Sequence, residues 1–265
     1  MISKKISTSV VSLLAAASLM GGFVALPALA DTTVGVTAST SVKLANQQQQ
    51  VAKIIAQSDK DITARITSLN NLNTRIQSMK NVSATVKSNL SAEVQTNITG
   101  LTSLKAKIDG ETDLPTLRSD SKSIFTAFRI YALVIPRGYI VASSDRITTI
   151  DGLMTTLSAK LQARITADQS AGKDVSALQT ALADLNAKVA DSGVQGQNAL
   201  NGVSSLVPDQ GNAAVIASNH TALLAARANI KTGSQDLQTA RQDAQTIVKG
   251  LKALNVKTST TPTTH

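Results

Sequence analysis

One segment of the sequence gathers side chains that could bind a ligand. Residues 125–146 hold every aromatic residue that follows position 30, together with a Pro-Arg-Gly break and charged residues set among apolar ones. The candidate residues are Phe125, Phe128, Arg129, Tyr131, Arg137, Tyr139, Asp145 and Arg146. Two arginines can hold an anion through charge-assisted hydrogen bonds, and tyrosine rings can stack beside it. The segment therefore indicates a surface for a ligand, a membrane or a protein partner.

The same residues also fit a purely structural role. Bulky rings can fill the widest point of a helical bundle, while Arg129 and Arg137 extend their charged ends to solvent. Asp145 and Arg146 near a helix start commonly face solvent or form weak local pairs. Packing is the more common use of such side chains, and both interpretations remain open from the sequence.

Residue types needed for catalysis or metal binding are scarce. The chain has no cysteine, which excludes thiol catalysis and cysteine-ligated metals. His220 is the only histidine before the C-terminal His265, so no triad or helical zinc site can be assembled around it. Glutamate occurs only at Glu93 and Glu111, in separate parts of the helical pattern. We therefore predict a protein that is not an enzyme and that needs no cofactor or metal.

The N-terminus predicts export. Residues 1–30 begin with Lys4 and Lys5, continue with a mainly apolar stretch, and end in small residues at Ala28 and Ala30. These are the three parts of a secretory signal peptide, with cleavage after Ala30. A retained membrane anchor is the alternative. No second apolar stretch is long enough to span a bilayer, so the mature chain is expected to lack a transmembrane segment and to lie outside the cytoplasm, secreted or held non-covalently at the cell envelope.

The charge balance is basic. The formal net charge of +9 becomes +7 without residues 1–30, which carry two lysines and no acid. A basic exported protein can meet wall polymers, lipid head groups or extracellular DNA. The basic residues are spread along the chain, however, and spread charges more often belong to solvated helix surfaces. We expect no specific recognition of nucleic acid.

Apolar residues recur at steps of three and four nearly throughout, which predicts helices. Aromatic content is 2%, so the core must come from Ala, Leu, Ile and Val, which suits closely packed helices and not a β-sandwich. The expected fold is an all-α, elongated antiparallel bundle with coiled-coil-like seams, with two three-helix units as one arrangement.

Helix ends follow from capping and breaking residues. Residues 80–83 favour a hairpin turn over an unbroken helix, Gly110 stops the next helix, and Asp113 caps the one after it. Pro136 ends or kinks that helix. Gly172 and Pro208-Asp209 separate the later helices, and the last helix keeps its phase through Gly233. The expected organisation is a flexible N-terminus at 31–40, helical units at 41–135 and 136–255, and a disordered tail at 256–265.

Part of the candidate segment also supports a resemblance. The stretch from Leu117 through Phe125 and Arg129-Ile-Tyr-Ala-Leu-Val-Ile-Pro136 to Asp145-Arg146-Ile147 resembles uncharacterised exported helical proteins of candidate-phylum bacteria. The order of signal peptide, helices, this segment and further helices is similar over most of the chain. The resemblance implies an exported bacterial helical protein and brings no activity with it.

The sequence thus favours a non-enzymatic exported or cell-envelope protein that serves a structural or interaction role. Its partner would be a protein or an envelope polymer, and a spare apolar face would allow self-association. The alternative is a basic binding module for an anionic envelope ligand, such as a wall polymer, a lipid head group or extracellular DNA. Arg129 and Arg137 motivate this alternative.

Overall fold

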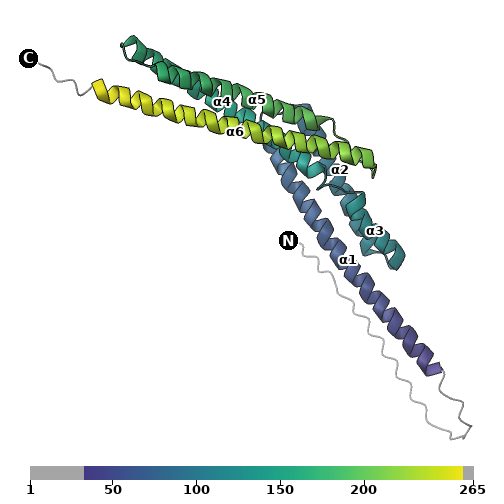
Figure 1. The fold of residues 1–265 in the computed structure, drawn as a ribbon. Coiled ribbons are helices and arrows are strands. Elements are labelled where there is room, and N and C mark those ends of the chain that lie inside the picture. The colour runs from purple at the N-terminus through teal and green to yellow at the C-terminus, as the bar shows by residue number, and fades with distance from the viewer. Residues whose placement is uncertain (1–32, 259–265) are drawn as a thin grey trace, which may run out of the picture. The chain divides into compact units, whose positions relative to one another are not determined.

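The computed structural model describes residues 33–258, and the burial of side chains is described for residues 41–256. Six helices make up nearly all of this part of the chain (Figure 1). They are α1 (Thr33–Ser78), α2 (Ala84–Asp109), α3 (Leu114–Thr126), α4 (Val134–Ser170), α5 (Ser176–Ser204) and α6 (Ala213–Thr258). The all-α fold class is therefore confirmed. The signal peptide at 1–30 with its cleavage site, and most of the predicted tail, lie outside the described residues.

Two compact units divide the chain at Ala45–Asn46, and every contact reported below lies in the second, residues 46–265. In the first, residues 33–45 are described and belong to α1. Helix α1 thus begins before the expected start near Ser41, inside the stretch predicted to be flexible. Helix α6 likewise continues to Thr258, past the expected end at residue 255. Both helices are thus longer than the periodic apolar pattern from which they were predicted.

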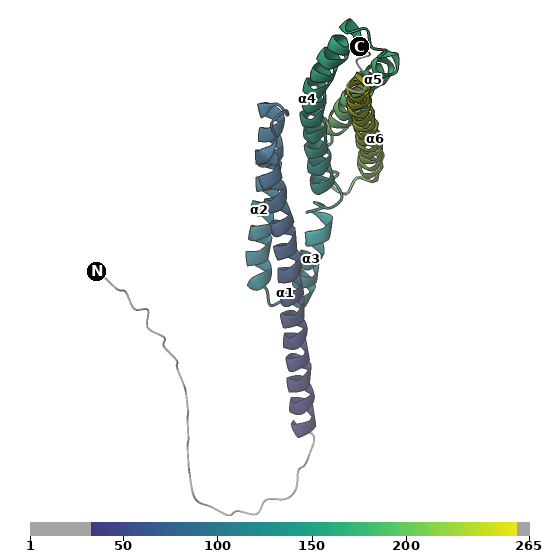
Figure 2. The same cartoon turned by 90° about the vertical axis from the view of Figure 1, so that its left-hand side faces the viewer.

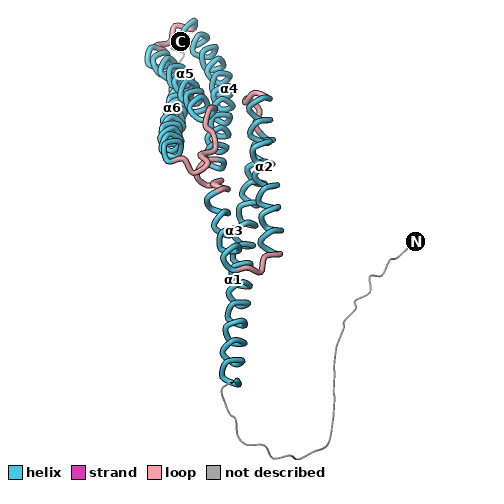
Figure 3. The backbone as a smooth tube through the Cα atoms, turned by 90° about the vertical axis from the view of Figure 1, so that its right-hand side faces the viewer, coloured by secondary structure: helices cyan, strands magenta, loops and turns pink. Residues whose placement is uncertain are grey.

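Short loops separate the first three helices (Figure 3), and capping residues flank α2 and precede α3. A turn separates α1 from α2, which confirms the hairpin at residues 80–83, and the Ser83 hydroxyl accepts a hydrogen bond from Val86 N at 3.3 Å. Gly110 follows the last residue of α2, and the Asp113 carboxylate accepts a hydrogen bond from Thr116 N at 3.0 Å. Each of these side chains satisfies a backbone N–H that the first turn of a helix leaves unpaired.

One expected helix end is wrong. The helix that begins after Asp113 was expected to continue to Pro136. Helix α3 ends at Thr126, residues 127–133 form turns, and Pro136 lies in the first turn of α4. Proline is tolerated there because the amide protons of the first turn have no helical partner. The break lies upstream because Phe128, Ile130 and Leu133 all pack on the core. At steps of two and three residues they cannot share one helical face.

Two hydrophobic clusters form the core of the described residues, and neither is built from one continuous stretch of the sequence. The first joins α1, α2 and α3 to the first turns of α4, and it also takes Val203, Leu206 and Leu223 from the region of the α5–α6 connection. The second lies among α4, α5 and α6, which Figure 2 shows side by side. The predicted boundary at 135–136 lies within the first cluster, α4 contributes to both clusters, and the α5–α6 connection packs on the first.

Helices α4 and α6 run in the same direction, each antiparallel to α5. Within the first half of each helix, a Cβ built on Gly233 of α6 would lie 3.2 Å from Ile147 Cδ1 of α4. Near their ends, Lys173 Nζ, just past α4, donates to Asn255 Oδ1 of α6 at 2.8 Å. Helix α6 is continuous through Gly233, as its seven-residue spacing predicted. Glycine permits this close approach because a side chain would meet α4 and α5.

Two glycines of α4 give a matched prediction for stability. A Cβ on Gly138 would lie 2.5 Å from Leu72 Cδ1 of α1, whereas a Cβ on Gly152 would meet nothing within 4 Å. We expect Gly138→Ala to lower the free energy of unfolding by about 1–3 kcal/mol, through overpacking. Gly152→Ala should raise it by up to about 1 kcal/mol, because alanine favours the helix. Urea unfolding followed by circular dichroism measures both, and equal effects would contradict the packing of α1 on α4.

Candidate functional site

Arg137 is bound inside the protein. Its Nη1 donates to Glu93 Oε2 of α2 and to Leu206 O at 3.1 Å each, and its Nη2 donates to Ser204 O at 3.1 Å. Burial raises the pKa of the Glu93 carboxyl above its ordinary value, and the charge of Arg137 opposes part of this rise. Because the guanidinium meets a carboxylate and two carbonyls, Arg137 joins α4 to α2 and to the end of α5.

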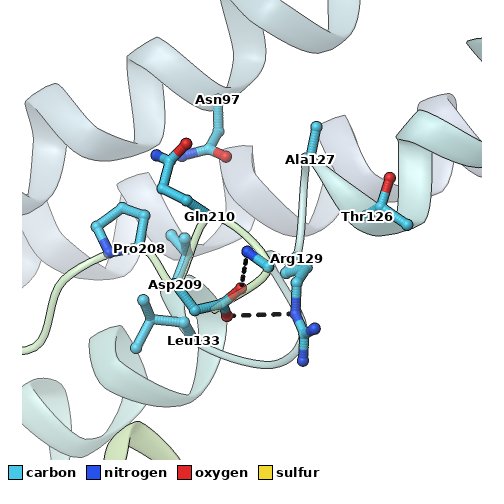
Figure 4. Close-up of a pocket in the computed structure, with 10 residues that line it drawn as sticks. Asn97, Thr126, Ala127, Arg129, Leu133, Pro208, Asp209 and Gln210 are labelled. Atoms are coloured by element: carbon cyan, nitrogen blue, oxygen red, sulfur yellow. Dashed lines mark hydrogen bonds and ion pairs between the residues drawn. The ribbon is translucent and has the colours of Figure 1, made fainter. Parts of the chain in front are cut away.

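Arg129 has one internal partner, and its two terminal guanidinium nitrogens are free. Its Nε lies 3.3 Å from Asp209 Oδ2, a distance for an ion pair, but their alignment does not make a hydrogen bond. The terminal nitrogens point away from Asp209 (Figure 4). Asp209 is 6% exposed, and its Oδ1 accepts a hydrogen bond from Gly211 N at 3.0 Å. This bond supports a tight turn in which Gln210 has a φ of 50°, unusual for a residue with a side chain.

The predicted pairing of Arg129 with Arg137 around one anion is therefore not formed by the fold. Each arginine meets a carboxylate of the chain itself, Asp209 in one case and Glu93 in the other. Only Arg129 keeps guanidinium nitrogens that can reach a ligand. The structural interpretation holds for Arg137, and the binding interpretation stays open for Arg129.

Asp145 and Arg146 are adjacent in sequence but take different roles. Asp145 is buried, and its Oδ1 accepts hydrogen bonds from three successive backbone N–H groups in the α1–α2 turn, at 2.9 Å from Lys80 N, 2.5 Å from Asn81 N and 3.1 Å from Val82 N. It fixes this turn against α4. Arg146 is exposed and forms no such contact.

The four aromatic residues separate into one packed and three exposed rings. Phe128 is partly buried where α2 carries Gly100, whose Cβ would lie 2.5 Å from Phe128 Cε1. The exposed rings stack against arginines of α1: the Arg65 guanidinium carbon lies 4.4 Å from the Phe125 centroid and 5.4 Å from that of Tyr131, and Arg75 lies 5.1 Å from that of Tyr139. These are cation–π distances. The rings therefore form part of the surface rather than the bundle centre.

A groove of about 500 Å³ opens between the 127–136 segment and the beginning of α6. Its floor is apolar, with Leu133, Pro136, Ile216 and Leu223. We call it the junction groove. Its polar residues are Arg129, Tyr131, Asp209, Asn219, His220 and Arg227. A smaller hollow of about 310 Å³ is lined by Pro136, Arg227, Tyr139 and Ile230. A third, of about 360 Å³, shares Arg129 and Asp209 with the junction groove (Figure 4).

The junction groove can hold a negatively charged group. Arg227 and His220 are exposed and form no ion pair or hydrogen bond within the described part of the chain. Its only carboxylate, Asp209, already meets Arg129 and Gly211. The Asn219 amide is also engaged, because it donates to Val207 O at 2.8 Å. The uncommitted polar groups are thus mainly cationic, above an apolar floor.

Sequence reasoning missed several residues of this region. Arg227 was not singled out, since nothing near it in the sequence marks a site. His220 was considered only as a metal ligand or catalytic base and set aside. Asp209 was identified only as part of a helix boundary, and Glu93 only as an isolated acid. Arg227 carries a weak signal, because it follows the buried Leu223 by one turn and so lies at the edge of the α6 seam.

Acidic residues collect on a different side, where α5 meets α6. Asp184 of α5 and Asp243 of α6 interact, and Lys188 Nζ of α5 lies 3.2 Å from Asp236 Oδ1 of α6. Burial raises the pKa of Asp243, and the charge of Asp184 raises it further. Two carboxyl groups that share a site in this way cannot both ionise without repulsion.

Other kinds of site find no support in the part of the chain that the structure describes. Residues 33–258 contain no group of three or more His, Cys, Asp or Glu side chains placed to hold a metal ion. None of the described helices has a stretch apolar and long enough to cross a membrane. No protein-family model matches the chain, and no significant match was found among curated proteins or solved structures.

The capping role of Asp145 predicts a large effect on stability. Asp145→Ala leaves three backbone N–H groups without their acceptor, and we expect the free energy of unfolding to fall by about 3 kcal/mol. Asp113→Ala, which removes an exposed cap from α3, should cost only about 1 kcal/mol. Chemical denaturation compares the two, and an equal loss would mean that the Asp145 contacts to the turn contribute little.

The Asp184–Asp243 pair predicts a pH effect with a defined sign. The pKa of Asp243 is raised in the folded state, so its stabilising contribution is present below its unfolded-state pKa and is lost as pH rises through the folded-state value. Asp243→Asn should therefore be more stable than the natural chain at neutral pH, by less than about 1 kcal/mol. The gain should shrink as pH falls through the pKa of Asp243. Asp191→Asn on exposed α5 surface is the control and should bring no gain in urea unfolding.

Proposed function

We propose that this protein is a non-enzymatic exported protein of the cell envelope that binds an anionic amphiphile, such as a lipid with an acidic head group, in the junction groove. The observation that carries the proposal is the combination of an apolar floor with the unpaired Arg227 and the free terminal nitrogens of Arg129, beside the exposed His220 imidazole. Export is supported by the signal-peptide pattern of residues 1–30.

The groove combines an apolar floor with cationic side chains, and this combination favours an amphiphile over a simple anion. Leu133, Ile216 and Leu223 offer an apolar surface to a hydrocarbon chain, whose transfer from water supplies the non-specific part of the affinity. Arg227 and the free end of Arg129 offer charge-assisted hydrogen bonds to a phosphate or carboxylate, which orient the molecule. A small hydrophilic anion would use only the second set of contacts.

The polar chemistry of the groove favours binding over catalysis. Arginine does not act readily as a proton donor or acceptor because its guanidinium stays protonated in proteins. Asp209 is held by Arg129 and by its own turn, so it is not placed to activate a nucleophile. A binding module needs only the shape and charge that these residues supply.

Calorimetric titration with dodecyl phosphate below its micelle concentration tests the proposal. We expect saturable binding, weakened roughly tenfold by Arg227→Ala through the loss of one charged hydrogen bond. Ala217→Trp, which places a ring in the groove from an exposed position of α6, should abolish binding. Lys231→Ala removes a cation one turn from Arg227 that does not line the groove, and it should change little.

The comparison with a neutral detergent of equal chain length separates the two parts of the site. Dodecyl maltoside should bind more weakly than dodecyl phosphate, and Arg227→Ala should not affect it. Equal binding of both detergents, or equal losses in the Arg227 and Lys231 variants, would contradict an anion site at the groove. Circular dichroism melting of each variant confirms that it remains folded.

A further inference from the structure

We propose that the face formed by α4 and α6 lies on an acidic lipid bilayer, with its cations against the head groups and its exposed apolar side chains in the interface. This surface differs from the junction groove in its residues, except for Arg227, which belongs to both. We call it the basic face. The proposal rests on where the charges of α4 and α6 point and on which side chains stand between them.

The cations of α6 occupy one side of the helix. Arg227, Lys231, Arg241, Lys249 and Lys252 fall within an arc of about 80° at 3.6 residues per turn. All five are exposed. Arg227 shares a hollow with Tyr139 and Ser143 of α4, which identifies this arc as the α4 side of α6. Over residues 227–252 the row extends for about 38 Å.

The cations of α4 face the same way. Arg146, Lys160 and Arg164 are exposed and fall within an arc of about 40°. Arg146 follows Tyr139 by seven residues, and Arg164 follows Leu157 by seven. Tyr139 lines the hollow that α4 shares with α6, and Leu157 packs on the core among these helices. Because α4 and α6 run in parallel, their cations form two adjacent rows.

Negative charge is kept away from this face. Asp236 of α6 lies 3.2 Å from Lys188 of α5, and Asp243 meets Asp184 of α5. On α4, Asp151 accepts a hydrogen bond from Ser192 of α5.

The remaining acids of α4 are also engaged elsewhere. Asp145 caps the α1–α2 turn, and Asp168 pairs with Lys173 at 2.9 Å. None of the eight cations of the basic face forms an ion pair or hydrogen bond within the described chain. The eight cations of the basic face therefore have no acidic partner in the described chain.

Exposed apolar side chains stand in the same rows as the cations. Leu153 is 66% exposed and lies midway between Arg146 and Lys160, seven residues from each. On α6, Leu224 is 49% exposed and precedes Lys231 by seven residues, and Val248 is 38% exposed and follows Arg241 by seven. On a solvated helix surface such side chains occur singly and make no contact. At a lipid interface, by contrast, the apolar side chain enters the interface while the long basic chains reach the phosphates.

The arrangement favours a planar surface over a linear polyanion. Two parallel rows of cations match charges that extend in two directions, as acidic head groups do, whereas a single polymer chain would follow one row. Each basic residue close to an acidic membrane contributes about 1 kcal/mol of binding free energy. Eight such residues together suffice for peripheral attachment, and the attraction weakens as salt screens it.

A single tryptophan tests the proposal directly, because the chain has none of its own. Leu153→Trp places the reporter on the basic face, and Val194→Trp places it at an exposed position of α5 as the control. Both full-length variants are titrated with vesicles of phosphatidylcholine alone and of phosphatidylcholine with an equal part of phosphatidylglycerol. We expect a blue shift of the Leu153→Trp emission with acidic vesicles only, reversed by high salt, and no shift for Val194→Trp.

Charge reversal supplies the second arm. Lys160→Glu, Arg164→Glu, Arg241→Glu and Lys252→Glu, combined in the Leu153→Trp chain, should weaken vesicle binding about a hundredfold or more. The matched control reverses the same number of exposed charges at Lys53, Lys60, Lys80 and Lys122, and it should bind vesicles nearly as before. The reporter sits on α4, so binding through another part of the chain does not produce the shift.

The outcomes separate this proposal from that of the junction groove. The four-charge variant should still bind dodecyl phosphate, and Ala217→Trp, followed by vesicle sedimentation, should still bind acidic vesicles. An unshifted Leu153→Trp spectrum, an equal shift for Val194→Trp, or equal losses in the two charge-reversal variants would overturn the basic face as a membrane surface. The proposal would also be overturned if inorganic polyphosphate alone produced the same blue shift of the Leu153→Trp emission as acidic vesicles and displaced the protein from them. That result would assign the face to a linear polyanion.

Discussion

Asp145 and Arg137, two turns apart at the beginning of α4, hold together parts of the chain that are distant in sequence. The Asp145 carboxylate binds three backbone N–H groups of the α1–α2 turn, and the Arg137 guanidinium binds Glu93 of α2 and two carbonyls at the end of α5. Both charges are largely removed from water, so each is stable only with its partners in place. The position of α4 against α2 and the α5–α6 connection depends on these bonds.

This constraint also explains how the protein can do without disulfides and with few aromatic residues. The two hydrophobic clusters are built from aliphatic side chains, with glycines where helices approach closely, as at Gly138 against Leu72 and Gly233 against α5. Such cores give helices little resistance to sliding along one another. Buried polar bonds at specific positions select one register, and here they lie where the two clusters meet.

The separation of charges among the helices of the second cluster gives α4 and α6 a basic side. The acids of α4 and α6 bond to α5, to the α1–α2 turn or to Lys173 after the end of α4. The eight cations of the basic face are therefore left without counter-charges. The same helices border the junction groove, where Arg227 stands at the end of the basic row. The groove and the basic face are therefore continuous in space, and an acidic lipid surface would satisfy both.

The sequence by itself determined the helical class, most of the buried residues and several helix ends. Periodic apolar positions report which side of a helix is buried, and residues such as Gly110 and Asp113 act on their immediate neighbours. The break at 127–133 escaped this reasoning because it contains no helix-breaking residue and arises from three apolar side chains that pack in different directions. Only the tertiary structure decided which charges are satisfied. Glu93 and Arg137, or Arg129 and Asp209, come together because helices distant in sequence meet, and helical periodicity does not specify which faces meet. For the same reason the sequence does not identify Arg227 or the basic face, which exists because α4 and α6 lie side by side.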